Sequence, residues 1–289
     1  MEFKEKFIVF VDILGFKSLV ESAENGTNMT LPELMSLLKD LGSKEDEEEF
    51  KKYGPKTCPE SRFTRKDLDF QVTQISDCAI VSAEISPAGA INLISHCWGS
   101  VITLLSKGIM CRGYITRGNI YHTNDQIIGS GYQAAFANES NVSAFKREAN
   151  ERGTPFVEVS SDVEKYILNE TDECVVKMYN RMVKSDGEVT ALFPFQRLSH
   201  SFAIGGMYGE FGEFNPEKEK ESNNNVRKYI HNVKERVMSF VDQENLKAMN
   251  KAAHYMAALE EQLSVCDKTD DVIDRLNAPA FGSGAYRDR

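Results

Sequence analysis

Apolar residues fall into blocks of strand-like and helix-like spacing over roughly the first 170 positions. The first block, Phe7 to Phe16, is almost continuously apolar and rich in β-branched and aromatic residues, which is typical of a strand buried on both faces. Helical spacing follows as far as Ser22, and again from Leu31 to Leu41. The later blocks predict a hairpin at 68–81, a helix at 88–107, a strand at 109–120, a helix from 129 to about 149, a strand at 154–159 and a short helix after 160.

This order of elements predicts an α+β fold of ferredoxin-like plan, with an antiparallel-rich sheet that carries helices. Residues 42–66 are charged and irregular, so we expect an exposed insertion there. The pattern changes after residue 170, which divides the chain into a domain of residues 1–170 and a helical C-terminal extension of residues 171–289. In the extension we expect a hairpin-like piece at 175–182 and 189–198, a glycine-rich loop at 205–212, a polar linker at 217–225, a helix pair at 226–241 and 245–265, and a disordered tail or dimer arm from 278.

The charge of the chain argues against several classes of protein. The formal net charge is -10 and no run is rich in lysine or arginine, so we expect no nucleic-acid partner. No segment approaches the apolar length that crosses a bilayer, and the charged start lacks the order of a signal peptide; we expect a cytoplasmic protein without a membrane partner. The cysteines and histidines show no CxxC, HxxxH or HExxH spacing, which disfavours a zinc site.

Asp12 is the unusual residue of the first strand, because a carboxylate without a partner is costly in a buried position. Either Asp12 caps the helix that follows, or it meets a cation at the end of the strand. Asp77 lies at the turn of the predicted hairpin, which the ferredoxin-like plan places beside the first strand. Two neighbouring carboxylates repel each other, so Mg²⁺ or Mn²⁺ would satisfy both, with the Ile13 carbonyl as a further ligand. Taken alone, Asp77 is better explained as a residue that stabilises a tight turn.

The residues after Asp12 shift the balance toward the cation site. Gly15 allows a tight turn, after which the backbone amides of Phe16 and Lys17 can face an anion at a helix N-terminus. Cations beside such a terminus suit a nucleoside triphosphate, because the cations bridge its phosphates while the amides hold the terminal ones.

Four segments, in order, resemble the motifs of the class III nucleotidyl cyclases. Phe-Val-Asp-Ile-Leu-Gly-Phe at 10–16 is similar to their Asp-Ile-x-Gly-Phe signature, and Ile-Ser-Asp at 75–77 to their second metal-binding hairpin. Residues 112–118 resemble their Arg-x-Gly-Ile-x-x-Gly strand in the spacing of Arg112, Ile115 and Gly118, although the first glycine falls at 113 instead of 114. Residues 129–140 resemble their Gly-Asn-x-Val-Asn-x-Ala-x-Arg-x-Asp/Glu-Ser helix, and the match covers roughly residues 7–168.

The resemblance implies a class III cyclase catalytic domain with two divalent cations, Mg²⁺ or Mn²⁺, bound by Asp12, Asp77 and the Ile13 carbonyl. Arg112 would then hold phosphate, as would the turn at Gly15 and Phe16. The resemblance also implies a homodimer with shared sites, in which one subunit supplies the metals and the other contacts base and ribose. The implied reaction is attack of the ribose 3′-oxygen on the α-phosphorus, with pyrophosphate leaving.

Two positions on the predicted helix from 129 bear on activity. Gln133 stands where the cyclases place the asparagine that orients the ribose, and an amide there keeps the hydrogen-bonding role. Ala137 stands where they place a transition-state arginine, and losing such a charge costs ~10²–10³ in rate by analogy with oxyanion-hole deletions. Arg117 or Lys146 could substitute, the metals could suffice, or the enzyme is inactive.

Gln71 and Gln126 stand at the two positions that select the base in the cyclases. Neither the Lys/Asp pair suited to adenine nor the Glu/Cys pair suited to guanine is present. An amide can both donate and accept a hydrogen bond, which fits the paired donor and acceptor edge of uracil or cytosine.

Within the superfamily, the chain is similar to the bacterial pyrimidine cyclases of Pycsar anti-phage defence. The likeness lies in the Val-Asp-Ile-Leu-Gly-Phe form of the signature, the Ile-Ser-Asp hairpin and a helical extension that contains Lys251-Ala-Ala-His-Tyr255. It implies UTP as substrate, preferred over CTP, and a cyclic nucleotide alarm signal read by a separate effector protein. The alternatives are a catalytically silent cyclase-fold dimer that senses a nucleotide, a purine cyclase with altered selectors, and a structural interaction module.

Overall fold

Strand β1 (Lys4–Ile13) lies at the centre of the fold, as the apolar run near the N-terminus predicts. The computed structural model describes residues 1–53, 67–199 and 214–277. Strand β3 pairs with one side of β1 and β4 with the other, and the side chains of Phe7, Ile8 and Val9 are fully buried. Because successive side chains of a strand point to opposite faces, β1 contributes to a core on each face of the sheet.

The sheet has the strand order β2-β3-β1-β4-β6-β8-β7, and β5 pairs with the end of β4. Strands β2, β3, β1 and β4 are each antiparallel to their neighbours, which is the ferredoxin-like plan and confirms the predicted α+β fold. Strand β6 extends the sheet parallel to β4. The bounds are β2 (Phe70–Ile75), β3 (Cys78–Glu84), β4 (Cys111–His122), β5 (Ile127–Ile128), β6 (Val157–Val159), β7 (Val183–Ser185) and β8 (Thr190–Leu192).

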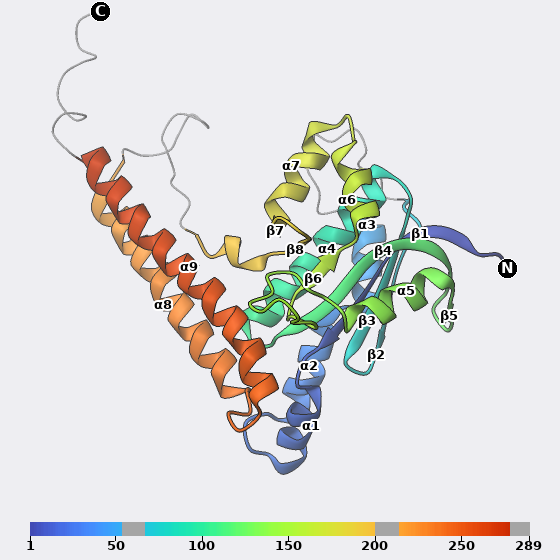
Figure 1. Ribbon diagram of the computed structural model, residues 1–289, viewed down its shortest axis with the longest axis horizontal. Helices are drawn as coiled ribbons and strands as arrows, with labels where there is room; N and C mark the ends of the chain where they lie inside the picture. The colour runs from blue at the N-terminus through green and yellow to red at the C-terminus, as the bar shows by residue number, and fades with distance from the viewer. Residues whose placement is uncertain (54–66, 200–213, 278–289) are drawn as a thin grey trace, which may run out of the picture.

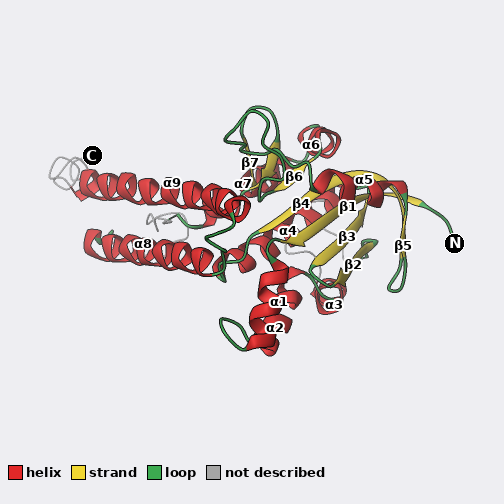
Figure 2. Ribbon diagram, turned by 60° about the horizontal axis from the view of Figure 1, so that its bottom comes forward, coloured by secondary structure: helices red, strands yellow, loops and turns green. Residues whose placement is uncertain are grey.

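Among the described residues, six helices contribute to the core on the face of the sheet that carries Phe7, Val9, Val11 and Ile13 of β1. The central one is α4 (Pro87–Ser106), which confirms the apolar helix predicted at 88–107. The others are α1 (Phe16–Asn25), α2 (Leu31–Leu41), α3 (Lys44–Tyr53), α6 (Ser161–Leu168) and α7 (Glu173–Met182). Figure 2 shows α4 lying across the strands.

Helix α5 (Ser130–Glu139) packs on the opposite face, over Ile8 and Phe10. Its first turn approaches β4 closely, because a Cβ atom built on Gly118 would lie 2.8 Å from the Cα of Gly131. Two glycines are therefore required where the backbones of α5 and β4 meet. This contact fixes α5 over the face that also carries Asp12.

Helices α8 (Pro216–Ser239) and α9 (Leu246–Asn277) form a long hairpin that extends away from the sheet (Figures 1 and 2). The base of α9 is anchored by the fully buried Tyr255 and Leu259, which share a core with Phe156 beside β6 and with Phe195 in the 3₁₀ turn η1 (Pro194–Arg197). This core and the core under α4 both contain residues from either side of position 170, whereas the small core under α5 does not.

Two expectations about the C-terminal half were wrong. Residues 175–182 are not a strand but belong to helix α7, in which Val175, Tyr179 and Met182 recur at helical spacing on the buried face. The polar stretch 217–225 is not a linker but the first turns of α8, where the Asn215 side chain caps the helix by accepting from the amides at 217 and 218. The first turns of α8 bury a polar residue, Asn223, whose side-chain amide donates to the Cys266 carbonyl. This part of the sequence therefore shows no apolar stripe.

Other boundaries differ from the prediction. Helix α5 ends at Glu139 instead of continuing to about 149, because the Val142 carbonyl accepts from the amides of Gly153 and Thr154 and turns the chain. The expected insertion at 42–66 begins with helix α3, and α9 runs twelve residues beyond the predicted end, from 265 to 277. Residues 54–66, the glycine-rich loop and the tail from 278 lie outside the described residues.

Helix α4 is long and apolar enough to cross a membrane by length and composition alone, so the expectation that no segment reaches that length was wrong. Within the described part of the chain it is the one such helix, and 61% of its apolar stretch is buried inside the protein. Its residues pack between the sheet and the helices around it, which explains the apolar composition.

Candidate active site

Asp12 and Asp77 lie together at one edge of the sheet. Asp12 is the next-to-last residue of β1, paired in register with Cys78 of β3 and with Arg112 of β4. Asp77 occupies the β2–β3 turn, where Ser76 adopts a left-handed backbone with φ 53°. The Ile13 amide donates to the Asp77 carbonyl at 3.0 Å, which ties the turn to the end of β1. The side chains of Asp12 and Asp77 are close enough to share a hydrogen bond.

The potential at this edge is strongly negative. Burial, then repulsion from Asp77 and Glu139, raise the pKa of Asp12 to about 7, and the charge of Arg112 only partly offsets them. Burial, then the charges of Asp77 and Asp12, raise the pKa of the Cys78 thiol to about 11. A cation between Asp12 and Asp77 would relieve this repulsion.

The donor set suits Mg²⁺ or Mn²⁺. No group of three or more His, Cys, Asp or Glu side chains is arranged to hold a metal ion in the part of the chain that the structure describes. Asp12 and Asp77 therefore provide two carboxylates without a closed cage. Magnesium is usually held in this way, by one or two carboxylates together with water and substrate phosphates.

The N-terminus of α1 opens beside Asp12. Gly15 is its N-cap, with φ 77°, and no side chain within the described ranges caps the helix. The interpretation of Asp12 as a helix cap is therefore wrong. The first amides of the helix, at Phe16 and Lys17, follow the glycine turn directly, and such amides bind anions when no side chain occupies them.

Arg112 forms an ion pair with Glu139 of α5, to which the Arg112 Nε atom donates. The Arg112 Nη1 atom donates to the Gly153 carbonyl at 3.4 Å. Glu139 is buried and Arg112 largely so, with side chains 8% and 15% exposed. Sequence reasoning did not assign Glu139 to the site. A signal was present, because Gly131, Ala135 and Glu139 are four residues apart and fall on the buried face of one helix.

Gln133 and Ala137 lie one turn apart on the exposed face of α5, and Phe136 beside them is 57% exposed. The structure therefore keeps these two positions on one surface but does not turn them toward Asp12. Arg117 and Lys146, the possible substitutes for an arginine at 137, already form ion pairs with Glu5 at 2.8 Å and Glu188 at 2.5 Å.

Gln71 and Gln126 belong to the other end of the sheet. Gln71 stands at the start of β2, and its half-buried side chain has an Oε1 atom without a hydrogen-bond partner among the described residues. It lines a pocket of about 320 Å³ with Tyr121 and Thr123, and Gln126 lies in the turn that Thr123 begins. Gln71 lies four positions before Ile75, the last residue of β2 before the Asp77 turn, and this spacing corresponds to about 13 Å along the strand.

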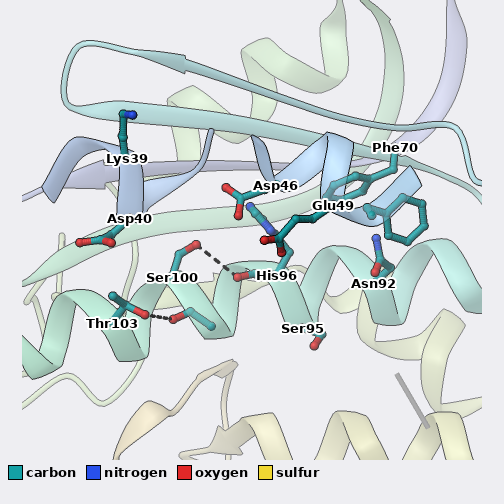
Figure 3. A pocket seen from close by; sticks show the side chains of 12 residues that line it. Lys39, Asp40, Asp46, Glu49, Phe70, Asn92, Ser95, His96, Ser100 and Thr103 are labelled. Atoms are coloured by element: carbon teal, nitrogen blue, oxygen red, sulfur yellow. Dashed lines mark hydrogen bonds between the residues drawn. The ribbon is translucent and has the colours of Figure 1, made fainter. Parts of the chain in front are cut away.

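Another pocket, of about 330 Å³, lies on the far face, between α4 and the α2–α3 segment (Figure 3). Figure 3 shows Asn92 and His96 on the side of α4 that faces Asp46 and Glu49. None of the predicted site residues lines it.

The comparisons with known proteins are sparse. No protein-family model matches the chain, and no curated protein matches its sequence. One similar solved structure is the catalytic core of a rhodopsin-guanylyl cyclase with converted specificity in complex with ATPalphaS. The two chains are 14% identical, the match covers 66% of this chain and 93% of that one, and the TM-score is 0.35. At that score the likeness adds nothing to the assignment below.

Proposed function

We propose that the protein is a class III nucleotidyl cyclase that converts UTP, or CTP, to the 3′,5′-cyclic monophosphate and pyrophosphate. The observation that carries the proposal is the pair of carboxylates at Asp12 and Asp77, held side by side at a sheet edge next to the uncapped N-terminus of α1. A structural interaction module would have no use for this repulsion.

In the proposed reaction Asp12, Asp77 and the Ile13 carbonyl hold two divalent cations, Mg²⁺ or Mn²⁺. Bound there, the cations would activate the ribose 3′-hydroxyl and offset the charge on the phosphates as pyrophosphate leaves. The α1 amides after Gly15, including that of Phe16, hold the terminal phosphate, and Arg112 lies beside the metal ligands. Gln133 orients the ribose through its amide.

The proposed active form is a homodimer with two shared sites. Within one chain the carboxylates and the selectors Gln71 and Gln126 lie toward opposite ends of the sheet. Gln133 and Ala137 face outward from α5, where a second copy can present its metal edge to them. This arrangement supports a nucleotide held between two subunits.

The preference for a pyrimidine rests on the two amides. The buried Oε1 atom of Gln71 accepts no hydrogen bond from the residues that the structure describes, and an amide can serve both the donor and the acceptor of a uracil or cytosine edge. The resemblance to Pycsar cyclases supports UTP over CTP, a role in anti-phage signalling, and a separate effector that reads the cyclic nucleotide.

A catalytically silent nucleotide sensor is the second candidate. Two observations favour it: alanine stands at 137, and Arg112 is already bound by Glu139. A sensor would bind the triphosphate with its cations but release no product.

The test is incubation of the full-length protein with each of ATP, GTP, CTP and UTP plus Mn²⁺, with Asp77→Asn as the control. We expect cyclic UMP, or cyclic CMP, from the wild type only. Absence of any cyclic product, together with metal-dependent UTP binding, would establish the sensor. A purine product would overturn the selectivity, and a product that survives Asp77→Asn would overturn the metal assignment. Active protein that elutes as a monomer would overturn the shared site.

A further inference from the structure

Helix α9 brings a lysine, Lys251, to the carboxylate edge of the sheet from more than 130 residues along the chain. The helix is fixed there by Tyr255, which is 1% exposed and lies within hydrogen-bonding reach of Cys111, the residue before Arg112. The Tyr255 ring also packs edge-on against Phe195 at 5.1 Å.

A second contact anchors the same turn of α9. His254 Nε2 lies 2.7 Å from a carboxylate oxygen of Glu151, and the segment that follows Glu151 provides the Gly153 carbonyl bound by Arg112. Lys251 precedes His254 by three residues and Tyr255 by four, so all three lie on one face of the helix. That face is the one that contacts Cys111 and Glu151.

Lys251 is a half-buried cation close to the charged groups of the candidate site. Its side chain is half-buried and lies within the fields of Arg112, Glu139 and Asp12. Burial, then repulsion by Arg112, lower the pKa of Lys251, while Glu139 and Asp12 act in the opposite direction. With the residues that the structure describes, Lys251 forms no ion pair.

Lys251 and Arg112 lie within electrostatic range of each other and repel, so an anion that contacts both would be favoured. Arg112 is only partly available to bind an anion, because its Nε atom is paired with Glu139. Lysine is a point charge on a flexible stem and reaches a phosphate without a fixed geometry. The cation that the chain lacks at Ala137 can therefore come from the C-terminal extension.

We propose that Lys251 binds the polyphosphate of the substrate at the Asp12–Asp77 edge, so that the C-terminal helix completes the phosphate site of its own chain. This inference rests on the proposed function for the identity of the substrate. It gives the extension a chemical role besides packing.

The test compares Lys251→Met with Lys268→Met, which removes an exposed lysine from the same helix more than four turns away. The first readout is calorimetric binding of inorganic tripolyphosphate in the presence of Mn²⁺. We expect Lys251→Met to weaken it about 10- to 100-fold, the range for one charge-assisted contact, and Lys268→Met to leave it unchanged. Lys251→Arg should recover most of the affinity.

The second readout is thermal unfolding without ligand. Removal of a cation that has no partner should leave the melting temperature of Lys251→Met equal to or above that of the wild type, whereas a lysine with a structural role would lower it. Wild-type tripolyphosphate affinity in Lys251→Met would overturn the inference even if cyclic product forms. Loss of binding in Lys251→Met without cyclic product from the wild type would keep the inference and overturn the cyclase. No tripolyphosphate binding by the wild type would overturn the phosphate site itself.

Discussion

The Asp12 carboxyl lies within hydrogen-bonding reach of the Asp77 carboxyl, and the backbone between them is tied by the 3.0 Å bond from the Ile13 amide to the Asp77 carbonyl. The main chain thus holds the carboxyl groups of Asp12 and Asp77 close together. Such a pair weakens the fold unless a cation or a proton neutralises it.

The first prediction concerns divalent cations. Mn²⁺ at about 100 times its dissociation constant should stabilise the wild type by about 2.7 kcal/mol. Asp77→Asn should abolish this increment and leave the metal-free protein at least as stable, because one of two repelling charges is gone. Thermal unfolding with and without Mn²⁺ measures both effects. Asp125→Asn, which removes an exposed carboxylate, is the matched control. An Mn²⁺ increment that persists in Asp77→Asn contradicts the prediction.

The second prediction concerns the buried ion pair. Arg112→Met should destabilise the protein by about 3–5 kcal/mol, because it leaves Glu139 buried near Asp12 and without its ion-pair partner. Glu139→Gln should cost less, since it also removes a negative charge from the edge. Urea unfolding measures the two variants. Arg117→Met, on the same strand, breaks a solvent-exposed pair and should cost at most about 1 kcal/mol. If Arg112→Met and Arg117→Met lose equally little free energy of unfolding, the Arg112–Glu139 pair does not stabilise the fold.

The third prediction concerns pH. Burial, then the charge of Lys6, lower the pKa of His122 from 6.5 to about 4; its ring nitrogens bond to Thr73 at 2.9 Å and Ser82 at 2.8 Å. Between these pH values the unfolded chain binds a proton that the folded protein does not, so the free energy of unfolding falls as pH falls from 6.5 to 4. The loss is up to about 3 kcal/mol.

The matching measurement is urea unfolding at pH 7 and at pH 4.5 for the wild type, His122→Gln and His231→Gln. His122→Gln should lose less stability on acidification than the wild type, whereas His231→Gln, which changes an exposed histidine, should follow the wild type. The same acid loss in all three proteins would assign the pH dependence to other groups.

The fourth prediction separates activity from stability on α5. Gln133→Ala should lower kcat for the cyclase reaction by about tenfold or more, which corresponds to one lost hydrogen bond to the ribose. Its stability should stay within about 0.5 kcal/mol of the wild type, because the side chain is exposed. Asn138→Ala, an exposed amide on the same helix, is the control. Unchanged kcat in Gln133→Ala would remove this residue from the site.

Local pattern was sufficient for the elements whose packing is visible in their own residues. The continuous apolar run predicted β1, alternation and a polar turn predicted the β2–β3 hairpin, and helical spacing predicted α4. Asp12 stood out because it was the lone carboxylate of a buried strand, and the element order placed Asp77 beside it.

Local pattern failed where a segment is stabilised by residues far along the chain. The polar start of α8 shows no apolar stripe that would predict a helix, because its buried Asn223 donates to the Cys266 carbonyl of α9, 43 residues away. No spacing rule near Asn223 contains that information.

The sequence by itself determined the central strands and the pair of carboxylates, since each depends on side chains within a few positions or on the order of elements. Only the tertiary structure decided the rest of the edge, with Glu139 on Arg112 and Lys251 near both, and it placed Gln71 and Gln126 at the far end of the sheet. The physical reason is that burial and charge are properties of surroundings, and these surroundings are assembled from α5, β4 and α9, which meet only in the folded chain.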